Sequence, residues 1–461
     1  MAGIVRYGSY IPYFRLERSA IGAGRGERAV ASYDEDSASM AVEAVREALA
    51  GSPDVGALVF ATTSPPYAEK LNAATIQAAC RLPESIRSFE LGASTRAGLG
   101  SLQLGADMAA AGTATLAVAS DVVVGAPGGA RESGGGDAAV AFLVGADSDA
   151  GAKICGRASS TLEILDVWRL PDEAFAHQWE ERFGAQIMGP TLIDTAQRAL
   201  KDAGVQPSDL KTVLLDSTNM RAAAGIPRAL GLKPEQLADP LAGSVGRTGS
   251  AHAGLLLARA LDVAAAGDRI LVLSGGDGCE AIVLEVTERI GSARPKHSVD
   301  DWIGSKRNDL GYTTYLKWRG VLPFEPPRRP DPERPAAPPS RRSEDWKYGY
   351  VGSRCTACGA GHLPPHRVCI KCAAVDQMEP RAFADVPCTV ATYTLDHLAY
   401  SMQPPVVAAI LDYEGGGRTN GELTDVDPSA IEIGMELQMT FRRLFTGQGV
   451  HNYFWKARPI R

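Results

Sequence analysis

Long hydrophobic runs and extended basic runs are both missing from this sequence of 461 residues. No stretch approaches the roughly 18 apolar residues that a membrane-spanning helix requires. The first residues, MAGIVRYGSYIPYFRL, lack the apolar centre of a signal peptide. The net charge is −7 and no cluster of Lys and Arg stands out, which argues against a nucleic-acid partner. We therefore expect a cytoplasmic protein without a membrane partner.

Cysteine is scarce, and half of its eight positions are isolated. Cys80, Cys155, Cys279 and Cys388 stand singly and show no disulfide framework. Isolated cysteines of this kind suit a reducing compartment. The length of the chain exceeds one ordinary hydrophobic core and predicts two to three domains.

The other four cysteines read C-T-A-C, ten residues, then C-I-K-C, and comprise Cys355, Cys358, Cys369 and Cys372. Two C-x-x-C pairs at this separation are typical of a tetrahedral zinc site, because each pair turns two sulfurs toward one point. Coincidental thiol pairs or disulfides are the alternative. Four thiolates leave no coordination position open, so a zinc ion here would be structural. The pattern predicts a small zinc ribbon over residues 345–376.

A repeat with a constant offset of 155 residues occupies the first 290 positions. DVGALVFATTS begins at Asp54 and DLKTVLLDSTN begins at Asp209, and 209 − 54 = 155. ADMAAAGTATLAVAS (106–120) aligns with LDVAAAGDRILVLSG (261–275) at the same offset. A duplication of this length implies two similar halves, about 1–150 and 151–290, related by a pseudo-two-fold axis.

Each half alternates helices with strands that are apolar on both faces. The expected elements are helices at 37–49, 97–111, 192–203 and 252–266, and strands at 57–61, 115–119, 212–215 and 269–273. Strands of this kind predict an α/β fold with buried sheets between helices. The second helix of each half is rich in Ala and Gly, so we expect it to be packed on all sides between two sheets.

The C-terminal third reads as a linker followed by a small module. Residues 300–320 carry four aromatic side chains on a polar stretch, which we expect to dock on the larger domain. LPFEPPRRPDPERPAAPPSRR (322–342) predicts an extended connector without regular structure. Residues 291–344 are therefore assigned to docking and linking. Short alternating segments over 377–461 predict a small β-barrel, and no basic stripe with aromatic residues points to nucleic acid.

Together these segments resemble the thiolase superfamily, and within it the 3-hydroxy-3-methylglutaryl-CoA synthases. The resemblance is carried by ATTSPPYAEKLNAAT (61–75), SDVVVGAPGGARESGGGDAAVAFLVG (120–145) and LGLKPEQL…GSVGRTGSAHAG (230–254). Residues 345–461, with GMELQMTFRRL and NYFWKARPIR, resemble the zinc-ribbon and OB-fold module that accompanies thiolase-like proteins. The resemblance implies duplicated αβαβα layers over 1–290, a CoA thioester substrate and a homodimer. A further thiolase or an acyl carrier is an additional candidate partner.

The residues that this family uses for catalysis are absent. The family acylates a cysteine at the N-terminus of the first buried helix, and a glutamate and a histidine transfer protons. The cysteine position falls at Thr95, the glutamate position at Thr63 and the histidine position near Asp216. A threonine hydroxyl needs an adjacent base to become a nucleophile. Ser94 and Thr95 are either catalytic or helix N-caps, and Asp216 is either a general base or the partner of a turn.

Further candidates lie in loops that the resemblance brings near the active site. His252 is either catalytic or a buried structural histidine. Cys279 is either a displaced nucleophile or inert packing, and Tyr67 is either an acid/base group or a core residue. Three glycines in one loop would leave room for a thioester or pantetheine arm: Gly275, Gly276 and Gly278.

Three functions are compatible with these residues. The first is an enzyme that makes or breaks the C–C bond next to a CoA thioester, by an aldol or retro-aldol step without a cysteine acyl-enzyme. The second is a non-catalytic acyl-CoA-binding partner or scaffold of a thiolase. The third is synthase-type condensation through a displaced nucleophile such as Cys279. The missing cysteine favours the first function, because an enolate needs stabilisation and a base but no thiol.

Overall fold

The computed structural model describes residues 2–49, 54–325, 330 and 332–461. Two compact units are present. The described parts of 1–31, 36–74 and 84–312 form the first unit, and those of 32–35, 75–83 and 313–461 form the second. No helix among the described residues is both long enough and apolar enough to cross a membrane.

A nine-stranded mixed sheet runs through the first unit in the order β11-β12-β13-β8-β1-β7-β6-β4-β5. Its strands are β1 (Ala2–Tyr10), β4 (Ala57–Ala61), β5 (Arg87–Leu91), β6 (Thr115–Asp121), β7 (Ala138–Ala146), β8 (Ala152–Thr161), β11 (Thr212–Ser217), β12 (Arg269–Gly275) and β13 (Gly278–Val286). The two halves meet through a short antiparallel pairing of Gly3 with Lys153 and of Ile4 with Ala152. The sheet is thus two layers joined along a brief seam.

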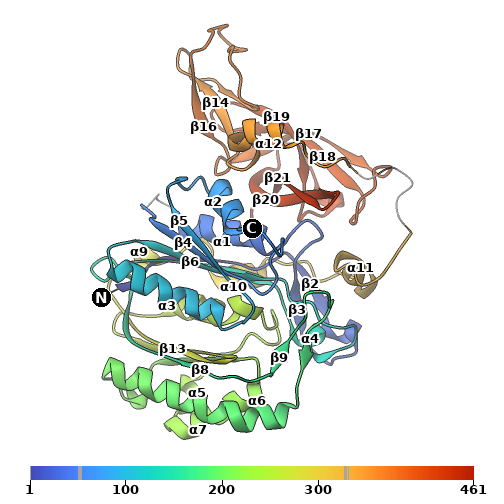
Figure 1. The fold of residues 1–461 in the computed structure, drawn as a ribbon. Helices are drawn as coiled ribbons and strands as arrows, with labels where there is room; N and C mark the ends of the chain where they lie inside the picture. Colours follow the sequence, from blue (N-terminus) through green and yellow to red (C-terminus); the bar gives the residue numbers. More distant parts are fainter. Residues whose placement is uncertain (1, 50–53, 326–329, 331) are drawn as a thin grey trace. The chain divides into compact units, whose positions relative to one another are not determined.

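Helices cover both faces of these layers, which explains why strands such as β4 and β6 are buried along their whole length. α1 (Ser37–Ala48) packs on β1, β6 and β7, and α5 (Glu181–Ala203) packs on β8, β12 and β13. α3 (Ala97–Ala110) and α8 (His252–Val263) touch each other and strands of the sheet. Figure 1 shows α3 between β4 and β6 on one side and β8 and β13 on the other, with α5 beneath. The predicted α/β fold class is confirmed.

The repeat read from the sequence coincides with these elements. α3 begins at Ala97 and α8 begins at His252, and 252 − 97 = 155. α8 is buried along most of its length. α3 is not, because Leu104 is 36% exposed and nothing lies within 4 Å of a Cβ placed on Gly100. The prediction that both small-residue helices are packed on all sides is therefore wrong for α3.

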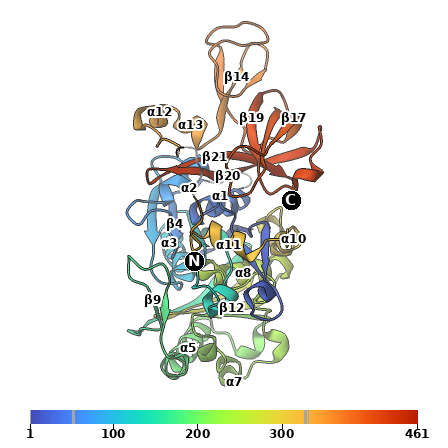
Figure 2. The ribbon, with the colours of Figure 1, turned by 90° about the vertical axis from the view of Figure 1, so that its right-hand side faces the viewer.

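The second unit contains a three-stranded ribbon and a closed barrel. The ribbon strands are β14 (Val351–Cys355), β15 (Gly361–His362) and β16 (Met378–Ala382). The barrel closes in the order β17-β18-β19-β21-β20, with β17 (Cys388–Asp396), β18 (Val406–Tyr413), β19 (Arg418–Leu423), β20 (Glu436–Gly447) and β21 (Val450–Pro459). Leu411, Phe441 and Trp455 are buried in it. In Figure 2 the ribbon around β14 extends beyond β17 and β19.

A buried charge cluster ties residues 32–35 to the barrel within this second unit. Arg442 lies 3.3 Å from Asp34, 2.7 Å from Glu35 and 2.6 Å from Asp425, measured between the charged nitrogen and oxygen atoms. Lys456 Nζ lies 3.0 Å from an Asp34 oxygen. Buried charges are tolerated when each has opposite charges at hydrogen-bond distance, as here.

The connector between the aromatic stretch and the ribbon is only partly irregular. Trp302, in α10 (Val299–Gly304), is buried and packs edge-on against Tyr10 with 5.3 Å between ring centroids. The expectation of no regular structure over 322–342 is wrong at its end, where α12 (Ala337–Arg342) forms. Proline is tolerated in the first turn of a helix, because a backbone N–H at that position would have no acceptor within the helix. Residues 326–329 and 331 of this connector lie outside the described residues.

Candidate functional site

The turn from β5 into α3 brings Ser94 and Thr95 to the N-terminus of the helix. Ala93 in this turn has a φ of 72°, a conformation that residues other than glycine rarely adopt. The first N–H groups of a helix lack acceptors within it, and among the described residues no backbone acceptor contacts the N–H of Thr95. A helix N-terminus with a free N–H favours a negative charge.

The hydroxyls of Ser94 and Thr95 are buried and have no hydrogen-bond partner within the described chain. α3 has Arg96 at its N-cap, and no side chain caps the helix. The interpretation of Ser94 and Thr95 as helix N-caps is therefore wrong. A buried polar group without a partner costs about 1–3 kcal/mol, and both hydroxyls have their hydrogen-bonding capacity unused within the described chain.

Thr218 supplies a third buried hydroxyl without a partner in the described chain, and Gly276 lies between it and Thr95. A Cβ placed on Gly276 would lie 3.3 Å from Thr95 Oγ1 and 3.6 Å from Thr218 Oγ1. Thr218 follows β11 and Gly276 follows β12, and these two strands pair in parallel. Hydroxyls from both halves of the repeat therefore face one point beside the N-terminus of α3. No motif or spacing in the sequence distinguishes Thr218 from other threonines.

The other two candidate glycines are required by packing within the protein. A Cβ on Gly275 would lie 2.7 Å from a methyl carbon of Leu192, and one on Gly278 would lie 2.0 Å from the carbonyl oxygen of Ser160. Gly278 also has a φ of 119°, which disfavours any side chain. The structure therefore supplies a reason for both glycines that needs no pantetheine arm, and leaves Gly276 as the one that faces the hydroxyls.

Asp216, the next-to-last residue of β11, is buried and forms an ion pair with Arg247. Its Oδ1 accepts a hydrogen bond from Arg247 Nη2 at 2.7 Å. The pair offsets the cost of burying a carboxylate in this place. Arg247 belongs to GRTGSAHAG, the segment that carries part of the family resemblance, but only the fold brings it to Asp216.

His252, the first residue of α8, is buried, and its ring is hydrogen-bonded within the protein. Nδ1 accepts a hydrogen bond from the N–H of Thr248 at 3.4 Å, and the ring also bonds to the backbone of Pro240. Burial lowers the pKa of His252 to about 4, although Asp216 opposes the shift. The ring is therefore neutral at pH 7 and holds a loop against α8. These properties favour the structural alternative for this histidine.

Asp121, which ends β6 and is buried, organises the loop that contains Thr63. The hydroxyls of Thr62, Thr63 and Ser64 donate to its carboxylate, as do the N–H groups of Thr63, Ser64 and Ser250. The hydroxyl of Thr63 thus donates a hydrogen bond to Asp121 Oδ2 at 3.0 Å. It cannot replace a glutamate that accepts a proton. The signal that could have identified Asp121 is an acidic residue directly after an apolar strand.

Cys279 and Tyr67 lie in contrasting surroundings. Cys279 is fully buried in a core cluster with Leu192 and Leu273, and burial together with the nearby charge of Glu280 raises the pKa of its thiol to about 12. An inaccessible thiol with this pKa is a poor nucleophile, which favours inert packing. Tyr67 lies partly exposed in the loop before α2 (Ala73–Ala79), and its N–H donates to the side chain of Asn72. Its acid/base role stays a prediction.

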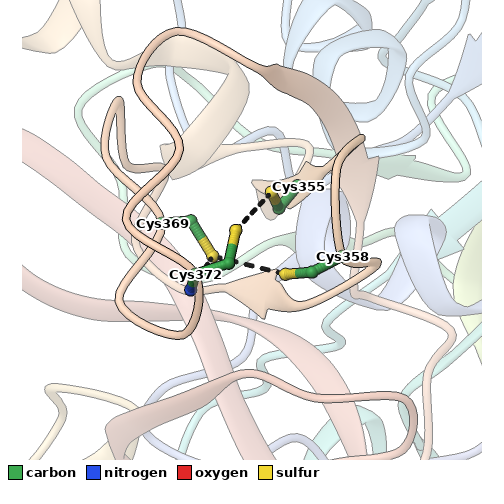
Figure 3. A group of neighbouring side chains, drawn as sticks. All are labelled: Cys355, Cys358, Cys369 and Cys372. Atoms are coloured by element: carbon green, nitrogen blue, oxygen red, sulfur yellow. Dashed lines mark hydrogen bonds between the residues drawn. The ribbon is translucent and has the colours of Figure 1, made fainter.

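The four paired cysteines converge in the ribbon. Their Sγ atoms all lie within 4.8 Å of one another, with 3.7 Å between Cys355 and Cys372 and 3.5 Å between Cys358 and Cys369. Figure 3 shows the four side chains pointing toward a common centre. All four are free thiols, so the disulfide alternative is wrong.

The donor set and its spacing fit a zinc ion. A tetrahedral site with Zn–S bonds of about 2.3 Å places sulfurs roughly 3.8 Å apart, close to the separations in the ribbon. The N–H groups of Lys371 and Cys372 each donate to Cys369 Sγ at 3.4 Å, which stabilises a thiolate. Four soft thiolates in this geometry would hold zinc in a closed, structural site.

Two family profiles match parts of the chain. The profile described as 3-Oxoacyl-[acyl-carrier-protein (ACP)] synthase III C terminal covers residues 200–286. The profile described as ChsH2, C-terminal OB-fold domain covers residues 387–442. The first match includes Asp216, Arg247 and His252, and the second lies in the barrel.

Whole proteins are similar to this chain over almost their full length. The chain is 30% identical over 346 residues to the hydroxymethylglutaryl-CoA synthase of Methanopyrus kandleri, with 70% of this chain and 98% of the relative covered. It is 29% identical over 341 residues to the enzyme of that name from Methanocaldococcus jannaschii, with 69% and 99% covered.

Solved structures show the same fold at lower identity. An HMG-CoA synthase complexed with CoA superposes with a TM-score of 0.58 at 16% identity, covering 68% of this chain and 89% of that one. The 3-oxoacyl-(acyl carrier protein) synthase III of Pseudomonas aeruginosa PAO1 superposes with a TM-score of 0.56 at 21% identity, covering 62% and 98%.

Proposed function

Because the chain belongs to the hydroxymethylglutaryl-CoA synthase family, we propose that it is an acyl-CoA-dependent enzyme that makes or breaks a C–C bond next to the thioester. The bond-making or bond-breaking step is an aldol or retro-aldol reaction, and no cysteine acyl-enzyme takes part. The family resemblance recognised in the sequence is confirmed, and a thiolase-type condensing enzyme is the activity that it supports.

The observation that carries the proposal is the chemical environment of the Thr95 hydroxyl. The position at the N-terminus of α3 holds a hydroxyl, not a thiol, and that hydroxyl is buried without a partner in the described chain. A hydroxyl there is a weak nucleophile without an adjacent base, but it is a good hydrogen-bond donor to a developing oxyanion. The N–H of Thr95 and the hydroxyl of Thr218 support the same role.

In the cleavage direction, the substrate is a 3-hydroxyacyl-CoA. Asp216 accepts the proton of the C3 hydroxyl while the C2–C3 bond breaks, and C3 leaves as a ketone or aldehyde. The electron pair of the broken bond is delocalised onto the thioester oxygen as an enolate. Thr95 and Thr218 stabilise this oxygen by hydrogen bonds. Protonation of C2 then gives the shorter acyl-CoA, and the reverse sequence is the aldol reaction.

Other residues have supporting roles in this proposal. Arg247 orients the Asp216 carboxylate through their 2.7 Å ion pair. His252 positions the loop that carries Arg247, and Tyr67 is a candidate proton donor. Cys355, Cys358, Cys369 and Cys372 would hold a structural zinc ion that stabilises the ribbon and takes no part in the reaction. A homodimer and an acyl-carrier partner stay predictions.

Mass spectrometry tests the proposal on the purified full chain. The protein is incubated with 3-hydroxybutyryl-CoA and 3-hydroxy-3-methylglutaryl-CoA, and both the intact protein and the small products are followed. A shorter acyl-CoA with its carbonyl partner, without a protein adduct, supports the proposal. An adduct mapped to Thr95, Ser94 or Cys279 would replace it by covalent catalysis. Binding without product or adduct would make the chain a non-catalytic acyl-CoA-binding partner.

A further inference from the structure

Arg131 lies beside the proposed site with its donors unused. It belongs to α4 (Ala130–Gly134) and is only partly exposed to solvent. Its Nε is buried and donates to no acceptor, and among the described residues its guanidinium forms no hydrogen bond or ion pair. Arginine has a rigid fork of donors that suits carboxylates and phosphates. A half-buried arginine whose guanidinium donors are unused is therefore a candidate for binding a ligand.

Backbone hydrogen bonds fix the segment that follows Arg131 next to Arg247. The N–H of Arg247 donates to the carbonyl oxygen of Gly134 at 2.9 Å, and the N–H of Gly136 donates to the carbonyl oxygen of Arg247 at 2.9 Å. The two segments approach closely at glycine, since a Cβ on Gly136 would lie 2.0 Å from the carbonyl oxygen of Val245. The segment directly after α4 is thus fixed alongside Arg247.

The carboxylates near Arg131 and Arg247 already bind other groups. Burial lowers the pKa of Arg131, Asp121 opposes this shift, and Arg247 and Arg169 add to it, so these three residues lie within electrostatic range. The carboxylate of Asp121 is occupied by hydroxyl and N–H donors of its own loop and of Ser250. The carboxylate of Asp216 is occupied by Arg247. Neither of these carboxylates is therefore bound to Arg131, and Nε of Arg247 is also buried without a partner in the described chain.

We propose that Arg131 and Arg247 bind an anionic oxygen group of the substrate, a carboxylate or a phosphate, next to Asp216. The acyl-CoA would then be anchored at two points, the thioester at Thr95 and the anion at the arginines. This inference rests on the proposed function, because it concerns the same ligand. A carboxylate would come from the acyl chain, and a phosphate would come from CoA.

Binding of matched thioesters to the full chain distinguishes these sources. Succinyl-CoA and butyryl-CoA have four-carbon acyl groups, both carry the CoA phosphates, and only succinyl-CoA carries a terminal carboxylate. Their dissociation constants are measured by isothermal titration calorimetry with wild-type protein and with Arg131→Met. Charge-assisted hydrogen bonds of this kind correspond to at least about a tenfold change in affinity.

Each outcome has one meaning. If Arg131→Met weakens succinyl-CoA about tenfold and leaves butyryl-CoA unchanged, the bound group is the carboxylate. If it weakens both thioesters equally, the bound group is a CoA phosphate. If it weakens neither, the inference is overturned while the proposed function stands. If wild-type protein binds no CoA thioester at all, the proposed function itself fails.

Control variants guard against a general loss of structure. Arg289→Met removes an exposed arginine elsewhere on the first unit and should change neither affinity. Arg131→Lys keeps the charge but not the fork, so it should recover part of the lost affinity. Should Arg131→Met fail to fold, as judged by its thermal unfolding, Arg131→Gln takes its place because it keeps a polar head group in the half-buried position.

Discussion

Arg442 Nη1 donates a hydrogen bond to Asp34 Oδ1 at 3.3 Å, although the two residues stand 408 positions apart and neither side chain is exposed. Burial by itself would raise the pKa of Asp34, but Lys456 and Arg442 hold it well below its ordinary value. A short segment near the N-terminus therefore belongs to the same charge cluster as two barrel strands.

Removing Arg442 should destabilise the second unit. Arg442→Met leaves the buried carboxylates of Asp34, Glu35 and Asp425 without their shared counter-charge. We expect the free energy of unfolding, measured by urea denaturation, to fall by about 3–5 kcal/mol. Arg418→Met removes an exposed partner of Asp412 and should leave the free energy of unfolding unchanged within error. Equal effects of the two substitutions would contradict the importance of the buried cluster.

The ribbon should contain one zinc ion per chain. We expect elemental analysis of the purified protein to find one equivalent, and Cys369→Ser to lose it because three thiolates bind zinc less tightly than four. Chelation should also unfold the ribbon, visible as faster hydrogen exchange over residues 351–382. Cys155→Ser, which alters an isolated cysteine of the first unit, is the control and should keep the metal. Full zinc retention by Cys369→Ser would disprove the assignment.

Thr95→Val tests whether the Thr95 hydroxyl serves catalysis or the fold. The substitution keeps the shape of the side chain and removes a donor that has no partner in the described chain. We expect kcat/KM for the C–C cleaving reaction to fall by about 10²-fold or more, while thermal stability stays equal or rises slightly. A loss of stability with unchanged turnover would instead mean that the hydroxyl serves the fold.

Asp216→Asn tests the proposed base. Asparagine still accepts a hydrogen bond from Arg247 but cannot take a proton, so turnover should be lost while acyl-CoA affinity changes little. Retained turnover would identify Asp216 as a partner of the turn. The stability effects of Asp216→Asn and Arg247→Gln should be non-additive, because each residue is the partner of the other at 2.7 Å.

His252 should make the protein less stable in mild acid. Its pKa is about 4 in the folded protein and about 6.5 when unfolded, so the unfolded chain binds a proton first. As pH falls from about 6.5 to about 4, the free energy of unfolding should drop by up to about 3 kcal/mol from this group alone. Urea denaturation at several pH values should show a shallower slope in His252→Gln. An identical slope in both proteins would rule out this contribution.

Local sequence patterns are sufficient to predict the repeat, the layered α/β class and the cysteine site. The offset of 155, seen again in 252 − 97 = 155, is visible in matching segments of the sequence, and hydrophobic periodicity predicts the helices and strands within them. The C-x-x-C spacing brings Cys355, Cys358, Cys369 and Cys372 together because each pair needs only a tight local turn. The family motif likewise locates Thr95 at the position of the missing cysteine, because that position is defined by neighbouring residues in the chain.

Which polar residues meet depends on the complete fold. Asp216 and Arg247 stand 31 positions apart, Thr95 and Thr218 come from different halves of the repeat, and Asp34 joins a barrel strand far along the chain. No local pattern encodes such pairings, because they depend on which strand ends share a sheet edge and which loops the packing brings together. The same packing made His252 a buried, neutral ring and Cys279 an inaccessible thiol. Burial, which is a property of the folded molecule and not of the sequence pattern, set the chemistry of both.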